Sequence, residues 1–95
     1  MEGLNVYRLF LGGDNKQEGL RFTREDVAAV LTAHGIDGAT LTRAHGLWKG
    51  KLEQTWVIEL WGIDPITLPL LAVALRDTFH QETVAYETGG RIYLV

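Results

Sequence analysis

The stretch ATLTRAHGLWKGKLEQTWVIELW, residues 39–61, decides the fold. It contains two segments rich in apolar and β-branched residues, Ala39 to Trp48 and Gln54 to Trp61, which are typical of strands. A short polar connection, Lys49-Gly50-Lys51-Leu52, joins them, and its glycine can adopt positive φ without a steric penalty. The stretch therefore predicts a β-hairpin.

Another strand and a helix are predicted before the hairpin. Leu4 to Leu11 is apolar on both alternating faces, which indicates a strand buried on both sides. Gly12 to Gly19 contains Gly-Gly-Asp-Asn and reads as a loop. Thr23-Arg24-Glu25-Asp26 supplies an N-cap hydroxyl with a carboxylate three residues on, so a helix begins there. It ends at about His34, because Gly35 suits a left-handed C-terminal cap.

A second helix and two short strands are predicted after the hairpin. The helix begins near Thr67, because Pro69 is tolerated only in the first turn of a helix. Thr83 to Glu87 and Arg91 to Val95 then read as strands. Thr88-Gly89-Gly90 joins them, and Gly-Gly favours a primed hairpin turn.

This order of elements predicts a single α+β domain over residues 1–95, a ferredoxin-like β-α-β-β-α-β sandwich with an extra C-terminal strand. Right-handed crossovers place both helices on one face of an antiparallel sheet, so the other face stays open. We expect five apolar residues on that open face, and a patch of this size is rarely tolerated on a monomer. They predict an interface between copies of the chain and comprise Tyr7, Leu9, Leu11, Val57 and Trp61.

Composition narrows the class of protein. The chain has 95 residues, of which 46% are hydrophobic, enough for one core and too few for two. It has no cysteine, which excludes disulfides, thiolate nucleophiles and Cys-ligated metals. A net charge of -3 argues against nucleic-acid binding. No apolar run approaches the roughly 20 residues of a membrane span, so a cytoplasmic protein is expected.

Basic and aromatic residues near the hairpin form the candidate ligand site. Cationic side chains and the backbone amides of a glycine turn can hold a small anionic metabolite. The alternative is that these residues are solvated charges that protect sheet edges from aggregation, with Trp48 as an interface anchor. The candidate residues are Arg43, His45, Trp48, Lys49, Lys51 and Arg91.

Catalytic and metal-binding patterns are absent from the sequence. The histidines, His34, His45 and His80, lie on different predicted elements without the spacing of a helical metal pair. Glu59 and Glu82 are general-base candidates, but nothing pairs either with an acid or a nucleophile. We therefore predict no catalytic residue, no metal and no cofactor.

Three stretches resemble the PII-like proteins, small ferredoxin-like relatives of the nitrogen-regulatory PII family. They are Ala44 to Gly50, Trp56 to Leu60 and His80 to Val84. The resemblance implies a trimer with small ligands bound in clefts between subunits. It does not extend to ATP or to control of targets by a long loop. The connection Lys49 to Glu53 is short, and His80-Gln81-Glu82 lacks the glycines of the nucleotide binders.

Three functions follow from these observations. The first is a non-enzymatic homo-oligomer that binds a small anionic ligand or a protein partner. The second is a cofactor-independent dimeric α+β barrel enzyme, which requires His45 or Glu59 to point into an enclosed cavity. The third is a phage or accessory-locus protein that acts by contact with a host protein near Trp48.

Overall fold

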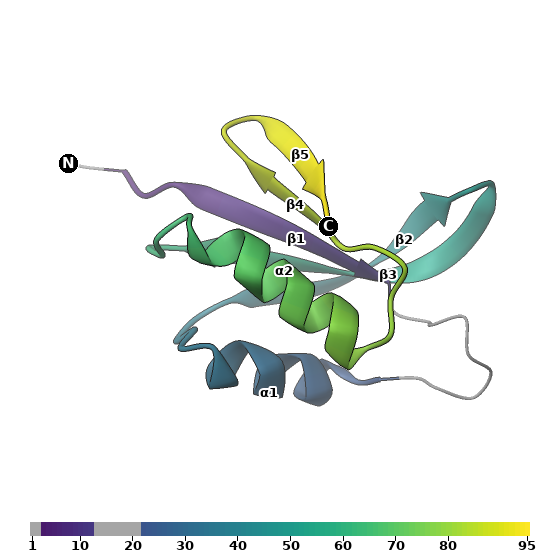
Figure 1. The fold of residues 1–95 in the computed structure, drawn as a ribbon, viewed down its shortest axis with the longest axis horizontal. Helices are drawn as coiled ribbons and strands as arrows, with labels where there is room; N and C mark the ends of the chain where they lie inside the picture. Colours follow the sequence, from purple (N-terminus) through teal and green to yellow (C-terminus); the bar gives the residue numbers. More distant parts are fainter. Residues whose placement is uncertain (1–2, 13–21) are drawn as a thin grey trace.

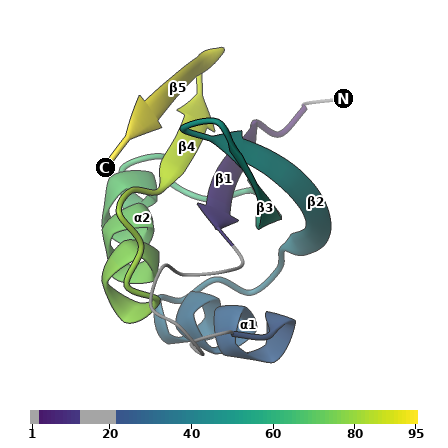
Figure 2. The same ribbon diagram turned by 90° about the vertical axis from the view of Figure 1, so that its right-hand side faces the viewer.

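The structure, a computed structural model, describes residues 3–12 and 22–95 and contains one antiparallel sheet with two helices on one face (Figures 1 and 2). The sheet has five strands in the order β2-β3-β1-β4-β5. The predicted ferredoxin-like α+β sandwich with an additional C-terminal strand is confirmed. Most of the loop expected at Gly12 to Gly19 lies outside the described residues. In chain order the elements are β1 (Val6–Gly12), α1 (Arg24–Ala33), β2 (Thr40–Trp48), β3 (Lys51–Trp61), α2 (Thr67–Thr78), β4 (Ala85–Thr88) and β5 (Arg91–Leu94).

The β2–β3 hairpin closes through two residues with left-handed backbone. Lys49 has φ 50° and Gly50 has φ 76°, the pattern of a primed turn that matches the twist of the strands. Because this turn is tight, pairing continues to the tip and β3 begins at Lys51, earlier than the expected Gln54. The Gly89-Gly90 turn between β4 and β5 has the same signs of φ.

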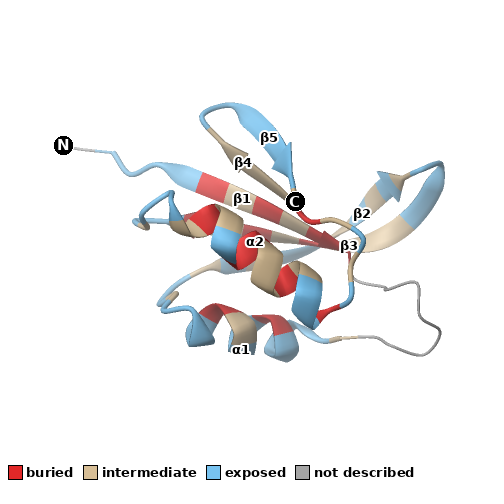
Figure 3. Cartoon of the chain, in the orientation of Figure 1, coloured by how far each residue is buried: buried red, intermediate tan, exposed pale blue. Residues whose placement is uncertain are grey.

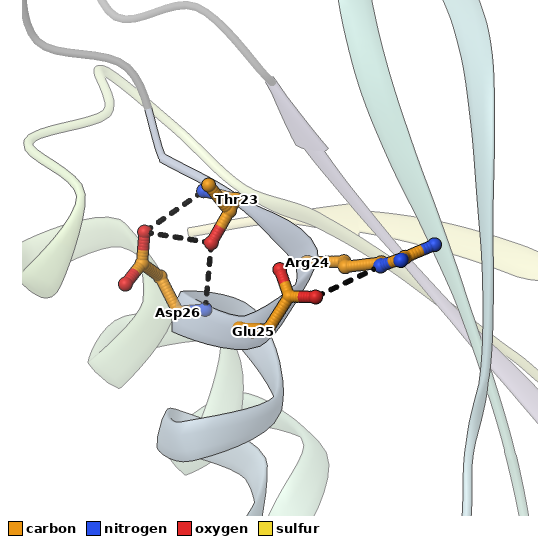
Figure 4. Close-up of polar contacts among 4 residues, drawn as sticks. All are labelled: Thr23, Arg24, Glu25 and Asp26. Carbon is orange, nitrogen blue, oxygen red and sulfur yellow. Dashed lines mark hydrogen bonds and ion pairs between the residues drawn. The ribbon is translucent and has the colours of Figure 1, made fainter.

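The N-terminus of α1 carries the expected cap (Figure 4). The Asp26 backbone N–H donates to the Thr23 hydroxyl at 3.3 Å, and the Thr23 N–H donates to the Asp26 carboxylate at 2.8 Å. This reciprocal pair satisfies two amides that the helix leaves without internal partners. Beside it, Arg24 donates to Glu25 at 3.0 Å, and that hydrogen bond lowers the pKa of the Glu25 carboxyl.

The C-terminus of α1 ends in the left-handed residue that the sequence predicts. Gly35 has φ 78°, and the Ile36 N–H donates back to the Leu31 carbonyl at 3.0 Å. His34 is the C-cap, and its ring lies 2.9 Å from the Val30 carbonyl through Nδ1. His34 thus contacts a backbone carbonyl in the last turn of α1.

Helix α2 begins at Thr67, where the sequence places it, and Pro69 lies in its first turn. The Thr67 hydroxyl donates to the Asp64 carbonyl at 2.7 Å, and the Ile66 N–H donates to the Asp64 carboxylate at 3.1 Å. These bonds fix the entry into the helix after Asp64-Pro65. Neither helix of the described residues combines the length and apolar character needed to cross a membrane.

The buried core lies between the sheet and the two helices (Figure 3). Leu9 of β1 stands opposite Ile58 of β3, and residues opposite each other in an antiparallel pair share a face. Both side chains are fully buried. The remaining core residues are Tyr7, Leu11, Val27, Leu31, Trp56, Leu60, Leu68, Leu71, Ala72, Leu75, Phe79 and Val84.

This register corrects the predicted open face. Tyr7, Leu9 and Leu11 lie under the helices, not on the open side with Val57 and Trp61. The prediction was wrong because both faces of β1 are apolar, so alternation alone does not say which face the helices cover. Their burial within one chain removes them from any surface that could contact a second copy.

The open face retains Val57 and Trp61 and adds Val6 and Phe10 of β1. Trp61 is 47% exposed and Val6 48% exposed. At the centre of this face, Arg8 donates to Glu59 at 3.0 Å and to Glu87 at 3.4 Å. The face is therefore apolar around one ion-pair cluster, and the homo-oligomer expected from it stays a prediction.

The face assignment predicts unequal effects of two truncations. Leu9→Ala leaves a cavity in the core and should lower the free energy of unfolding by about 2–5 kcal/mol. Trp61→Ala removes a half-exposed ring and should cost about 1 kcal/mol or less. Urea denaturation followed by circular dichroism measures both. A larger loss for Trp61→Ala than for Leu9→Ala would contradict the assignment.

Removal of the α1 cap gives a second test. Thr23→Ala should lower the free energy of unfolding by about 1 kcal/mol, because the Asp26 N–H loses its acceptor. Thr32 is exposed on the same helix, and Thr32→Ala should change stability by about 0.5 kcal/mol or less. Equal effects of the two substitutions in urea denaturation would show that the cap adds nothing.

Candidate ligand cavity

A cavity of about 200 Å³ lies on the open face of the sheet, between the β2–β3 hairpin and the connection from α2 to β4. The strand residues that form its floor belong to the open face, because Phe10, Ala85 and Leu94 are cross-strand neighbours of one another. Its full lining is Phe10, Gly12, Gly46, Leu47, Trp48, Glu53, Thr55, His80, Gln81, Glu82, Thr83, Ala85 and Leu94.

Contacts between the hairpin and the α2–β4 connection form one wall. The Trp48 indole N–H donates to one oxygen of Glu82 at 3.4 Å, and the Lys49 ammonium donates to the other oxygen at 2.6 Å. The same ammonium lies 5.7 Å from the centre of the Trp48 ring, within the range of a cation–π contact. Trp48 and Glu82, distant in sequence, thus hold the two sides of the cavity together.

The α2–β4 connection enters the cavity through a strained residue. His80 has φ 54°, and the Gln81 N–H donates to the Arg76 carbonyl at 2.9 Å, as after a left-handed cap. Glycine is the usual residue at this position because a side chain adds steric strain there. The Gln81 amide donates to the Phe79 carbonyl at 3.1 Å, so the turn also places its side chain.

Two glycines make room for the polar lining. A Cβ on Gly12 would lie 2.7 Å from the Gln81 amide oxygen and 3.3 Å from a Glu53 oxygen. A Cβ on Gly46 would collide with the Thr55 hydroxyl. Gly12 ends β1, so the Gln81 and Glu53 side chains can lie directly over the last residue of this central strand.

The charge of the lining favours a cationic ligand. The described lining includes two carboxylates, Glu53 and Glu82, and Lys49 pairs with Glu82 from the rim. Carboxylates around a concave site raise the local concentration of cations and repel anions. The Trp48 ring adds an aromatic face, which attracts organic cations.

Part of the predicted anion site lies at this cavity. Trp48 lines it, and Lys49 reaches its rim through Glu82. Lys51 is exposed beside the turn and pairs with Trp48 across the hairpin. The hairpin therefore contributes to a site, but Lys49 is already engaged by a carboxylate.

The other predicted residues do not converge on it. Arg43 lies 5.3 Å over the ring of Trp56, whose side chain belongs to the helix-covered face. His45 is exposed on β2, opposite Gln54. Arg91 is on β5, and β5 and β2 are the two opposite edge strands (Figure 1).

The residues that the barrel-enzyme alternative requires also lie elsewhere. His45 and Glu59 do not line the cavity, and Glu59 is bound to Arg8. In the described part of the chain, no group of three or more histidine, cysteine or carboxylate side chains is arranged to hold a metal. Glu82, a base candidate from the sequence, does lie in the cavity.

Sequence reasoning missed Glu53, Gln81 and Gly12. One signal was available: His80 follows α2 at the position where a glycine normally ends a helix. A residue that breaks this local preference points to a function for its neighbourhood.

Comparisons with known proteins identify one solved structure with a similar fold. No family model and no curated protein matches the sequence. A solved structure of a phage SAM (S-adenosylmethionine) lyase in its apo state matches with a TM-score of 0.66 and 24% sequence identity. The match covers 100% of this chain and 94% of the phage lyase. At this identity the likeness establishes a shared fold.

The strained residue gives a test at the cavity edge. His80→Gly should raise the free energy of unfolding by about 1 kcal/mol, because glycine adopts positive φ without the steric penalty. His34→Gly is the matched control at the end of α1, where φ is -98° and the ring contacts Val30, so it should destabilise. Thermal and urea denaturation measure both. Destabilisation by His80→Gly would mean that its side chain stabilises the fold by more than the strain.

Proposed function

We propose that the chain binds S-adenosylmethionine in this cavity and cleaves it as a lyase. The observation that carries the proposal is the lining, in which the carboxylates of Glu53 and Glu82 and the ring of Trp48 surround one cavity. S-adenosylmethionine has a permanent positive charge on its sulfonium sulfur, which carboxylates and aromatic faces attract. The fold shared with a phage SAM lyase over the whole chain supports the same assignment.

The chemistry of the sulfonium suits a small site without a cofactor. When the bond between sulfur and the aminobutyrate γ-carbon breaks, its electron pair moves to sulfur and releases the neutral thioether 5′-methylthioadenosine. In the same step the γ-carbon receives an electron pair, either from the ligand's own carboxylate, which closes a lactone, or from the neighbouring β-carbon's C–H bond, which forms a C=C bond while a base accepts the proton. The first route needs no protein base, and Glu82 or Glu53 is placed in the cavity for the second.

The cavity is small, which favours a binding site completed by a second copy of the chain. Its volume of about 200 Å³ is below the about 300 Å³ at which pockets for drug-sized ligands begin. Phe10 belongs both to the cavity floor and to the open face, so a copy seated on that face would also close the cavity. The proposal therefore keeps the predicted homo-oligomer. The oligomeric state to test first is the trimer that the PII-like resemblance implies.

The direct test is an assay of the purified chain with S-adenosylmethionine. Mass spectrometry should detect 5′-methylthioadenosine together with a lactone or an unsaturated amino acid. Glu53→Gln and Glu82→Gln should each lower the rate about 10- to 100-fold, the effect of losing one charge-assisted contact. Glu25→Gln on the exposed surface of α1 should leave it unchanged. Absence of both turnover and calorimetric binding would overturn the proposal.

One observation favours the alternative of host-protein contact. Leu47 and Leu52 face each other near the hairpin tip and are 70% and 77% exposed, which is typical of a surface that meets a partner. Leu52 does not line the cavity, so Leu52→Ser should leave S-adenosylmethionine turnover intact. If Leu52→Ser abolished the effect of the protein on host cells while turnover of S-adenosylmethionine persisted, the hairpin tip would be assigned to a protein partner.

A further inference from the structure

We infer that the Trp48 ring and the Glu82 carboxylate form the subsite for the ligand's sulfonium, and that the Lys49 ammonium occupies this subsite in the free protein. The inference rests on the proposed function and states where the positive charge of the ligand would lie. The Lys49 ammonium lies 2.6 Å from Glu82 and 5.7 Å from the centre of the Trp48 ring. Carboxylate and ring face together are what an organic cation would contact.

The two elements of the subsite are held in one orientation. The Trp48 indole N–H donates to the Glu82 oxygen that Lys49 does not contact, at 3.4 Å. This bond joins the ring of β2 to the carboxylate of the α2–β4 connection before any ligand arrives. Both residues line the cavity, whereas Lys49 contacts them from its rim. The negative side of the subsite is thus preorganised.

Lys49 can leave this place without a change of fold. Its side chain is 61% exposed in the pair and extends from the tip of a hairpin, so water can solvate the ammonium as it moves away. An ammonium is strongly hydrated in water. A sulfonium carries its charge on a group surrounded by carbon and donates no hydrogen bond through sulfur, so it gains more from the ring and the carboxylate.

Displacement of Lys49 depends on the charge that the ligand brings to the subsite. S-adenosylmethionine brings a positive charge that replaces the ammonium, whereas 5′-methylthioadenosine has a neutral sulfur and cannot. Once the carbon–sulfur bond breaks, the attraction at the subsite is lost and Lys49 can return to Glu82. Lys49 therefore competes with the cationic substrate for the subsite and weakens its binding, whereas the neutral thioether is affected less.

The test compares Lys49→Met with Lys51→Met by calorimetry at low salt. Both remove one exposed lysine of the hairpin, but only Lys49 contacts Glu82 and the Trp48 ring. Lys49→Met should bind S-adenosylmethionine about 2- to 5-fold more tightly, the equivalent of one exposed ion pair. Its affinity for 5′-methylthioadenosine should change less, and Lys51→Met should match the wild type for both. Unchanged or weaker binding of S-adenosylmethionine by Lys49→Met would overturn the inference and leave the proposed function intact.

A minimal cation tests the subsite independently of the proposed function. Trimethylsulfonium is titrated while the indole N–H resonances are followed by NMR, with Trp56 and Trp61 as internal references. In Lys49→Met the Trp48 resonance should shift at a lower concentration than in the wild type. That result, with no binding of S-adenosylmethionine by any variant, would support the subsite and reject the proposed function. Absence of a Trp48 shift in Lys49→Met would reject the subsite.

Discussion

The antiparallel pairing of β1 with β3 is the contact on which the rest of the structure depends. β1 lies between β3 and β4 in the sheet, and the register that sets Leu9 opposite Ile58 decides which side chains the helices cover. A shift of one residue would bring either Arg8 or Glu59 under the helices, where the charge would be buried at high cost. The same register leaves Phe10 and Gly12 on the open side, where they form the floor of the cavity.

Features that depend on neighbouring residues could be predicted from the sequence. The α1 cap at Thr23, the left-handed Gly35 and the Gly-Gly turn each result from the local chemistry of a few residues. The order of the elements then restricts the topology, because right-handed crossovers leave few alternatives. The faces of β1 could not be assigned in this way, because apolar residues on both sides remove the signal on which alternation depends.

The cavity was harder to predict because its residues come from segments far apart in the chain. Trp48 was recognised, but its partner Glu82 lies beyond β3 and α2, and nothing in the spacing of the two residues indicates that they meet. Lysines near a glycine turn suggested an anion site. The structure instead brings carboxylates to the cavity and engages Lys49 with one of them. The sign of the charge at a site therefore depended on a long-range contact.

The Arg8 cluster links the strands that lead to the two walls of the cavity. Its guanidinium, on β1, is bonded to Glu59 on β3 and to Glu87 on β4, so a single side chain ties three adjacent strands together. The hairpin wall continues from β3, while the opposite wall leads into β4. The ion pairs thus add to the backbone pairing that sets the spacing of these three strands. Half-exposed ions are screened by salt, so this contribution of the side chains weakens as ionic strength rises.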